Sequence, residues 1–325
     1  MNYKVLVTGG LGFIGSHVVD ELMGIGGNVS VVDISKRRDT ENPKAKYYNV
    51  DIRDHNALEK VFKLERPEYV LHLAALARIQ PSFEDPFGFF TTNALGSANV
   101  LMSAKKYGVK RVIYSASSSA YGDQKTPLHE NMHIHPQALN PYSSTKRMGE
   151  MLMRDMGKLT SGVETVCLRY FNVYGPRQTT AADGAYATVI GIFFERLANK
   201  QPLPVVPDGY QKRDYTYVSD VAAANIAAML SDKVGGGEII NIGFGKNYSI
   251  WDAVRLVHKL PVAVSPDDLI SKNHAVFAPK RIGEAKETLA DIALAKKLIN
   301  WEPLVSFGEG IEKCREFYKN QGWNV

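Results

Sequence analysis

The sequence predicts a doubly wound α/β fold, in which helices cover both faces of a parallel sheet, with a second, smaller domain attached. Short apolar runs alternate with longer helical patterns through the first half of the chain. A glycine-rich turn separates the first strand pattern from the first helix pattern. The 325 residues, of which 45% are hydrophobic and 22% charged, are enough for two folded domains.

The expected strands and helices follow one another in regular order. The first strand covers residues 5–7, a helix follows over 13–23, and a second strand covers 29–32. The next helix–strand pairs cover residues 57–64 and 69–73, then 95–107 and 111–115, and then a helix from 142 and a strand over 164–168. Because the strands are apolar throughout rather than at alternate positions, both faces of the sheet are expected to be buried.

The chain beyond residue 174 differs in pattern from what precedes it. Proline and glycine become denser after Tyr174-Gly175-Pro176, and strands and helices alternate less regularly. Residues 213–244 resemble a return to the sheet. We therefore expect one domain over residues 1–172 and 213–244, and a second over 173–212 and 245–325.

Composition excludes several classes of protein. No apolar run approaches the roughly 18 residues of a membrane span, and the N-terminus runs directly into a strand pattern, so we expect no membrane segment and no signal peptide. The net charge of +5 suits an anionic small molecule, whereas nucleic-acid binders concentrate basic residues in a stripe. Cys167 and Cys314 lie far apart in apolar surroundings and are expected to be reduced, as in a cytoplasmic protein.

The glycine turn predicts a dinucleotide site. Gly9, Gly12 and Gly15 have the spacing G-x-x-G-x-x-G between a strand and a helix, where a pyrophosphate approaches the backbone of a Rossmann-type sheet. Asp33 ends the next strand pattern, where a carboxylate accepts hydrogen bonds from an adenosine ribose and repels a 2′-phosphate. The turn and Asp33 therefore favour NAD over NADP; the alternative is a tight turn beside a surface aspartate.

Two Tyr-x-x-x-Lys sequences compete for a catalytic role, Tyr121/Lys125 and Tyr142/Lys146. The first lies in a turn, where this spacing brings no side chains together. The second follows the helix-start signal Asn140-Pro141, so its tyrosine and lysine share one helix face. We expect the Lys146 ammonium to lower the pKa of Tyr142 and make it a usable base, and Tyr121 to be a packing residue.

Other polar residues remain ambiguous. Ser117 falls at the carboxyl end of a strand, where ligands of open α/β sheets bind, but a serine-rich strand end also suits a turn. His129, His133 and His135 lie in a polar loop without an acidic or cysteine partner, so we expect no metal. Arg78 is a candidate ligand of a diphosphate or a surface residue.

The glycine turn, the aspartate after the second strand, the serine and the tyrosine–lysine pair together resemble an extended short-chain dehydrogenase/reductase. In that family Asp51 and Ile52 correspond to an adenine-contacting pair, and Tyr170 and Phe171 to residues beside the nicotinamide. The resemblance implies an NAD site formed by Gly9, Gly12, Phe13, Ile14, Gly15, Asp33, Asp51, Ile52, Leu73, Ala74, Ala75, Asn93, Ser115, Tyr142, Lys146, Tyr170 and Phe171.

Further segments resemble nucleotide-sugar enzymes of this family. Residues 168–177 match the crossover into the substrate domain, and the segments around Arg213 and Arg281 resemble those that clamp a sugar diphosphate. Residues 184–190 are most similar to the branch that acts on N-acetylated UDP-hexoses. The resemblance implies a UDP-sugar site formed by Ser117, Ser118, Tyr142, Asn172, Ala187, Val189, Arg213, Arg281 and Thr288.

The residues after Ser117 favour one reaction within this family. Sugar dehydratases and UDP-glucuronate decarboxylases carry carboxylates there, whereas this chain has Ser118 and Ser119. The departure resembles the UDP-hexose 4-epimerases, with Tyr142, Lys146 and Ser117 as the catalytic residues. Ala77 replaces a lysine of many UDP-galactose epimerases, so other nucleotide-sugar enzymes, UDP-glucuronate 4-epimerase among them, stay open. A non-catalytic cofactor sensor is the alternative outside enzymes.

The resemblance also implies a substrate gate and a dimer. Counting seven residues from Arg281 gives Thr288, at a position where a tyrosine admits only a hydroxyl at C2 of the sugar and a small residue admits an N-acetyl group. The alternative is a surface threonine, or a gate at Glu287 or Leu289. Residues 98–104 and 148–156 have apolar faces that related homodimers use as a helix bundle, though core packing would use the same residues.

Overall fold

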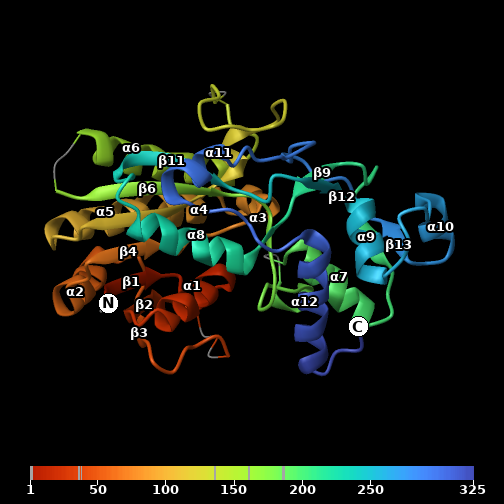
Figure 1. Ribbon diagram of the computed structural model, residues 1–325, viewed down its shortest axis with the longest axis horizontal. Helices are drawn as coiled ribbons and strands as arrows, with labels where there is room; N and C mark the ends of the chain where they lie inside the picture. The colour runs from red at the N-terminus through yellow and green to blue at the C-terminus, as the bar shows by residue number, and fades with distance from the viewer. Residues whose placement is uncertain (1–2, 36, 38, 135–136, 160–161, 185–186) are drawn as a thin grey trace.

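The computed structural model describes residues 3–35, 37, 39–134, 137–159, 162–184 and 187–325. Its centre is a seven-stranded sheet in the order β11-β6-β5-β4-β1-β2-β3 (Figure 1). All neighbouring strands in it run parallel. The strands are β1 (Lys4–Thr8), β2 (Asn28–Asp33), β3 (Lys46–Asn49), β4 (Tyr69–His72), β5 (Arg111–Ser117), β6 (Glu164–Tyr170) and β11 (Gly236–Ile242). The predicted doubly wound Rossmann-type sheet is confirmed.

Helices cover both faces of this sheet, because successive strand residues point to opposite sides and are apolar on both. Val5 and Val7 of β1 join one core, whereas Leu6 between them joins the other. The first core is closed by α1 (Phe13–Gly24), α8 (Val218–Leu230) and α11 (Ala293–Ile299). The second is closed by α2 (His55–Glu65), α5 (Ser97–Lys106) and α6 (Pro141–Leu159).

The helix expected over residues 95–107 differs from the prediction. The segment begins earlier, as α3 (Ile79–Glu84) and α4 (Pro86–Phe89), and passes through a π-helix, η1 (Phe90–Gly96), before α5. Gly96 explains part of this path, because a Cβ there would lie 2.7 Å from Cδ1 of Ile52. A π-helix widens the turn, and such turns are frequent at functional sites.

A second, smaller domain lies beside the sheet (Figure 1, right). Its core gathers aromatic and aliphatic residues between Tyr174 and Tyr318, with Phe307 stacked on Tyr215 at 4.5 Å between ring centroids. Its strands pair as β7 (Val173–Tyr174) with β10 (Thr216–Tyr217), β9 (Lys212–Asp214) with β12 (Asn247–Ser249), and β8 (Leu203–Val205) with β13 (Ala275–Phe277). Its helices are α7 (Val189–Ala198), α9 (Ile250–His258), α10 (Pro266–Ser271) and α12 (Phe307–Asn320).

The exact division between the domains stays a prediction. Residues 213–244 contribute β11 to the sheet, as the sequence indicated. Ala295, Ile299 and Trp301 pack into the core on the α1 face of the sheet, although they fall within the range 245–325 assigned to the second domain.

Cys167 and Cys314 are buried and form no disulfide. Within the described part of the chain, no helix has the length and hydropathy that crossing a membrane requires.

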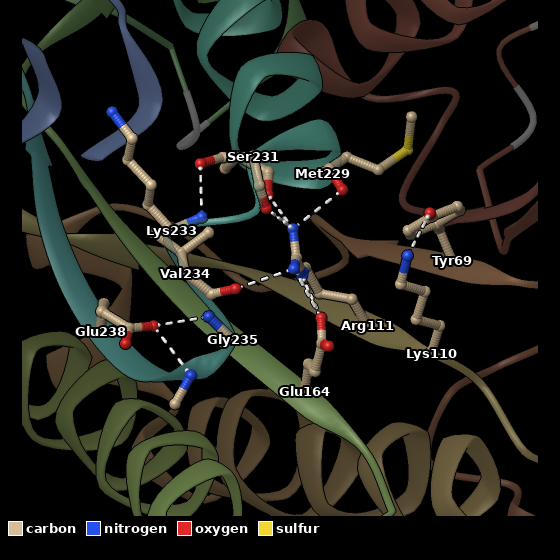
Figure 2. A network of polar contacts seen from close by, with 12 residues as sticks. Tyr69, Lys110, Arg111, Glu164, Met229, Ser231, Lys233, Val234, Gly235 and Glu238 are labelled. Carbon is tan, nitrogen blue, oxygen red and sulfur yellow. Dashed lines mark hydrogen bonds and ion pairs between the residues drawn. The ribbon is translucent and has the colours of Figure 1, made fainter. Parts of the chain in front are cut away.

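Arg111 anchors the edge strand β11 from the amino end of the sheet (Figure 2). Its buried guanidinium donates to the carbonyl oxygens of Ala228, Met229, Ser231 and Val234 at 2.6–3.0 Å. Nη2 also lies 2.6 Å from Oε2 of Glu164. One cation thus satisfies the carbonyl groups where α8 ends, which would otherwise be buried without partners.

Replacing Arg111 by methionine should therefore destabilise the protein. The aliphatic part of the side chain is kept, but four carbonyl groups lose their donor and Glu164 loses its ion pair. We expect a loss of about 3 kcal/mol in the free energy of unfolding, measured by urea titration. Lys110→Met is the matched control, because the neighbouring Lys110 is exposed and should change stability little. Equal stability of the two variants would contradict this role.

Candidate active site

The glycine turn has the geometry that a bound pyrophosphate needs. Gly9 has a φ of +76°, and a Cβ on it would lie 2.6 Å from the backbone nitrogen of Ala74. A Cβ on Gly15 would overlap the carbonyl oxygen of Gly9. Helix α1 starts after Gly12 with no side chain capping it, which leaves the amides of Phe13, Ile14 and Gly15 at the open end of the helix.

Asp33 lies beside this turn at the carboxyl end of β2. Its Oδ2 accepts from the backbone nitrogen of Leu11 at 2.9 Å and its Oδ1 from that of Ser35 at 2.8 Å. These bonds fix the carboxylate and leave each oxygen a further lone pair for ribose hydroxyls. The turn and Asp33 therefore fit a dinucleotide without a 2′-phosphate.

The other residues predicted for the cofactor lie along the same edge. Leu73, Ala74 and Ala75 continue β4 past the glycine turn. Asp51 follows β3, where Nη2 of Arg53 lies 2.6 Å from its Oδ2 and holds its pKa below the usual value. Ile52 is buried against Gly96. Their contact with an adenine stays a prediction.

The side chains of three residues predicted for the cofactor are buried in the interior: Tyr170, Phe171 and Ser115. The Tyr170 hydroxyl donates to Oδ1 of Asn225 at 2.9 Å and lies 3.0 Å from Oγ of Ser115. Phe171 packs in a small core with Tyr121 and Leu128. A contact between Tyr170 or Phe171 and a nicotinamide stays a prediction.

A buried polar chain, which the sequence did not predict, links the glycine-turn edge of the sheet to α6. Nδ1 of His72 lies 2.6 Å from Oγ1 of Thr8, and its Nε2 lies 2.9 Å from Oγ of Ser97. Because Ser97 donates to the carbonyl oxygen of Asn93, Nε2 carries the histidine proton. Nδ2 of Asn93 then donates to Oγ1 of Thr145 on α6. Burial lowers the pKa of His72 to about 3, so the ring is neutral.

Tyr142 and Lys146 lie one turn apart near the start of α6, and Ser117 ends β5 beside Tyr142. Asn140 caps this helix, since its Oδ1 accepts from the backbone nitrogen of Ser143 at 2.8 Å. Ser117 lies beside the phenol of Tyr142, where it acts to lower the phenol pKa, and both residues line one cavity. Lys146 is buried one turn further along, with Nζ 4.6 Å from the centre of the Tyr114 ring.

The electrostatics of Tyr142 differ from the prediction. Burial raises its pKa above the ordinary value, while the hydrogen bond from Ser117 and the positive charge of Arg78 oppose this rise. The expected lowering by Lys146 was wrong for this arrangement, because its ammonium lies over Tyr114 and the opposing cation is Arg78. Burial also lowers the pKa of Lys146 to about 8.

Tyr121 is a packing residue, as the sequence indicated. Its hydroxyl donates to Oδ1 of Asn241 at 2.7 Å. Its ring lies under the Arg169 guanidinium, 4.4 Å from the ring centre, and this arginine forms a buried ion pair with Glu150 at 2.6 Å. Tyr121 is therefore held away from the cavity that Tyr142 lines.

A cavity of about 530 Å³ opens in front of Tyr142, between the carboxyl edge of the sheet and the second domain. Residues from both domains line it. All nine residues predicted for the substrate are among them: Ser117, Ser118, Tyr142, Asn172, Ala187, Val189, Arg213, Arg281 and Thr288. Ala185 and Tyr186, which share the segment of Ala187 and Val189, lie outside the described residues. The volume suits a nucleotide-sized ligand.

Two arginines and one glutamate form the second-domain wall of the cavity. Nη2 of Arg213 lies 3.3 Å from Oε2 of Glu284, and Nη1 of Arg281 lies 3.9 Å from its Oε1. Gln80 and Asn140 of the first domain donate to the carbonyl oxygens of Ile282 and Gly283. The arginine-bearing segment is thus tied across the cavity, where planar guanidinium groups suit phosphate oxygens.

Thr288 is buried in this wall rather than exposed on a loop. Its Oγ1 accepts from Nδ2 of Asn172 at 3.1 Å and from the backbone nitrogen of Asp214 at 3.2 Å. Asp214 is itself buried and accepts from the backbone nitrogens of Phe244, Gly245 and Ala290. The position of Thr288 is therefore fixed by several segments at once.

The predicted absence of a metal concerned His129, His133 and His135. His129 and His133 are exposed, and His135 lies outside the described residues. In the ranges that the structure describes, no three histidine, cysteine, aspartate or glutamate side chains gather closely enough to hold a metal ion.

The Rossmann-type sheet, the glycine turn and the Ser117–Tyr142 pair on the cavity define a dinucleotide-dependent enzyme of the short-chain dehydrogenase/reductase class. Comparison with protein families specifies this further. Residues 5–243 match the NAD dependent epimerase/dehydratase family, and the chain belongs to that family. It is thus an NAD-dependent isomerase, and the expected resemblance to UDP-hexose 4-epimerases is confirmed.

Individual relatives cover almost the whole chain. The UDP-glucose 4-epimerase of Thermotoga maritima, solved with UDP-glucose, is 36% identical with a TM-score of 0.88, covering 99% of both chains. The UDP-N-acetylglucosamine 4-epimerase of Methanobrevibacter ruminantium M1, solved with UDP-N-acetylmuramic acid, is 32% identical with a TM-score of 0.85, covering 99% of this chain and 100% of that one. The UDP-glucuronate 4-epimerase of Thermodesulfobacterium geofontis is 33% identical over 97% of this chain and 95% of its own.

Proposed function

We propose that the protein is a 4-epimerase that interconverts UDP-hexoses through a transient 4-keto sugar. The observation that carries this proposal is the Ser117–Tyr142 pair facing a cavity whose opposite wall holds Arg213 and Arg281. The proposed substrates are UDP-GlcNAc and UDP-GalNAc, UDP-glucose and UDP-galactose, or both pairs. The relatives act on different sugars at similar identity, so the choice rests on the cavity itself.

The proposed mechanism assigns one task to each group. NAD, which the glycine turn and Asp33 would hold, would supply a reversible hydride acceptor for C4 of the sugar. Tyr142 removes the proton from the 4-hydroxyl and later gives it back, and Ser117 orients that hydroxyl. Arg213 and Arg281 hold the diphosphate, so that the flat keto sugar turns about a fixed anchor. The glycine turn and Asp33 hold the pyrophosphate and adenosine ribose of NAD.

The residues around the pair favour epimerisation over the other reactions of the family. Elimination of water needs an additional acid and base, whereas Ser118 and Ser119 follow Ser117 here. The cavity instead offers uncharged lining at Ala187 and Val189, beside which a sugar ring can turn. A non-catalytic cofactor sensor would not need the Tyr142–Ser117 pair.

The direct test is to incubate the purified protein with UDP-glucose, UDP-GlcNAc and UDP-glucuronate separately and to follow each product by NMR. Formation of the 4-epimer without net NADH is expected, because the hydride returns to the sugar. Titration of the free protein should show tighter binding of NAD than of NADP. Stoichiometric NADH would instead indicate a dehydrogenase, and loss of water or carbon dioxide a dehydratase or decarboxylase.

We further propose that the protein is a homodimer and is cytoplasmic. Large apolar side chains are exposed on η1, α5 and α6: Leu95 47%, Met102 54%, Met148 46% and Met151 50%. Pairing these helices with those of a second copy would remove this surface from water. Light scattering should give a mass of twice 36.0 kDa, and a mass of 36.0 kDa would contradict the dimer. The two unpaired buried cysteines support a reducing compartment.

A further inference from the structure

Arg78 occupies an unusual position beside the proposed reacting atoms. It precedes α3, at the end of the loop that leaves β4, and lines the cavity together with Ser117 and Tyr142. Its φ of 91° is one that L side chains rarely adopt. Such a backbone conformation persists only where the surroundings impose it, and it is frequent at ligand sites.

Neighbouring contacts hold this loop in place. The side-chain amide of Asn93 brackets Leu76, accepting from its nitrogen at 2.8 Å and donating to its oxygen at 2.9 Å. On the other side of Arg78, Gln80 donates to the carbonyl oxygen of Ile282 at 3.0 Å. Arg78 therefore lines the cavity from a backbone that is held on both sides.

The charges of the cavity separate Arg78 from the other two arginines. The charged residues among the described lining of the cavity are Arg78, Arg213, Arg281 and Glu284. Arg213 and Arg281 both lie beside this glutamate on the second domain. Arg78 lies on the first domain, and its charge acts on Tyr142 as well as on Arg281. The cavity thus carries Arg78 beside the proposed base Tyr142, in addition to the two arginines assigned to the diphosphate.

We propose that Arg78 binds a carboxylate carried on C5 of the sugar, so that UDP-hexuronates are further ligands of this site and bind more tightly than the neutral UDP-hexoses. The proposal rests on the proposed function, which places the 4-hydroxyl of the sugar at Tyr142. The C5 substituent is attached to the carbon next to C4, so a group there lies within reach of a cation beside Tyr142. A planar guanidinium binds a carboxylate through two parallel hydrogen bonds, and one that is already positioned loses little freedom on binding.

Turning the sugar has a consequence for the two epimers. Rotation about the diphosphate exchanges the C3 and C5 sides of the ring, so Arg78 faces the carboxylate in one orientation and the 3-hydroxyl in the other. One of UDP-glucuronate and UDP-galacturonate therefore binds more tightly than its neutral counterpart, and the other gains less.

Binding is the measurement that tests this proposal separately from turnover. Tyr142→Phe serves as the background, so that ligands are not converted during calorimetry. The Kd of each uronate is divided by that of its neutral counterpart, UDP-glucose or UDP-galactose. We expect at least one uronate to bind about 10-fold or more tightly than its counterpart. Arg78→Gln should bring both ratios close to one.

Arg213→Gln is the matched control in the same cavity. It removes a guanidinium assigned to the diphosphate, so it should weaken acidic and neutral ligands alike and leave their ratio as it was. The proposal would be overturned if the Kd ratios of uronate to neutral ligand were near one in the protein that keeps Arg78. It would also be overturned if Arg78→Gln left these ratios unchanged. A loss of bound NAD in Arg78→Gln with unchanged ratios would assign this arginine to the cofactor instead. A uronate preference without formation of any epimer would leave Arg78 as proposed and refute the epimerase.

Discussion

Replacing Tyr142 by phenylalanine is expected to lower kcat by about 10²- to 10⁴-fold, with NAD still bound. The ring and its edge contact with Phe89, 6.3 Å between centroids, remain, so the variant should keep its fold. What is lost is the hydroxyl beside Ser117, to which we assign the removal and return of the sugar proton. Steady-state turnover of the best substrate, together with measurement of the NAD content, checks this.

The control and the pH dependence make this prediction specific. Tyr121→Phe removes a hydroxyl bonded to Asn241 outside the cavity and should leave kcat within a few-fold. Because burial raises the pKa of Tyr142, its phenolate fraction grows as pH rises through the neutral range, and the rate of the unaltered protein should rise with it. Near-normal turnover in Tyr142→Phe, or a large loss in Tyr121→Phe, would assign the base to another residue.

Replacing Thr288 by tyrosine should abolish turnover of UDP-GlcNAc and UDP-GalNAc while sparing UDP-glucose. Thr288 lines the cavity, whereas the side chain of neighbouring Glu287 is engaged by Nδ2 of Asn247. A phenol at this point would fill the space for an N-acetyl group, and overpacking of this kind costs roughly 1–3 kcal/mol even where atoms can shift. Turnover of UDP-GlcNAc and of UDP-glucose is measured separately for each variant. The ratio of the two rates shows whether this position selects against the N-acetyl group.

Thr288→Ser is the control, since it keeps the hydroxyl that accepts from Asn172 and Asp214. It should retain turnover of both kinds of substrate. Thermal unfolding of the tyrosine variant shows whether it has folded. Equal loss on neutral and N-acetylated sugars in a folded variant, or an unaltered protein inert toward UDP-GlcNAc, would show that this position is not a gate.

The features that the sequence predicted well are those that depend on local pattern. Apolar strands and the glycine spacing indicate a Rossmann-type sheet because both follow from short-range geometry. Tyr142 was preferred to Tyr121 because a helix-start signal precedes it, and the structure places only the former, of these two, on the cavity. Thr288 was reached through a family resemblance, since no local pattern marks it.

The features that it did not predict depend on contacts between distant segments. The edge strand β3 is half-exposed and lacks the continuous apolar pattern of the others. The π-helix η1 begins in a polar stretch, and its path depends on Ile52 from an earlier loop. The effect of Arg78 on Tyr142 joins residues 64 positions apart, which no spacing rule connects. The sequence indicates only a strand at His72, because its partners Thr8 and Ser97 come from other elements.

The neutral state of His72 makes a contribution to how this protein responds to acid. Its pKa of about 3 in the folded chain lies below the ordinary 6.5, so the unfolded chain takes up a proton that the folded chain refuses. Stability therefore falls as pH drops below about 6.5, and continues to fall toward pH 3. Between those values the link from Thr8 to α6 keeps one proton arrangement in every folded molecule. Through this residue, acid lowers the fraction of folded protein, while His72 and its hydrogen bonds to Thr8 and Ser97 stay unchanged in the molecules that remain folded.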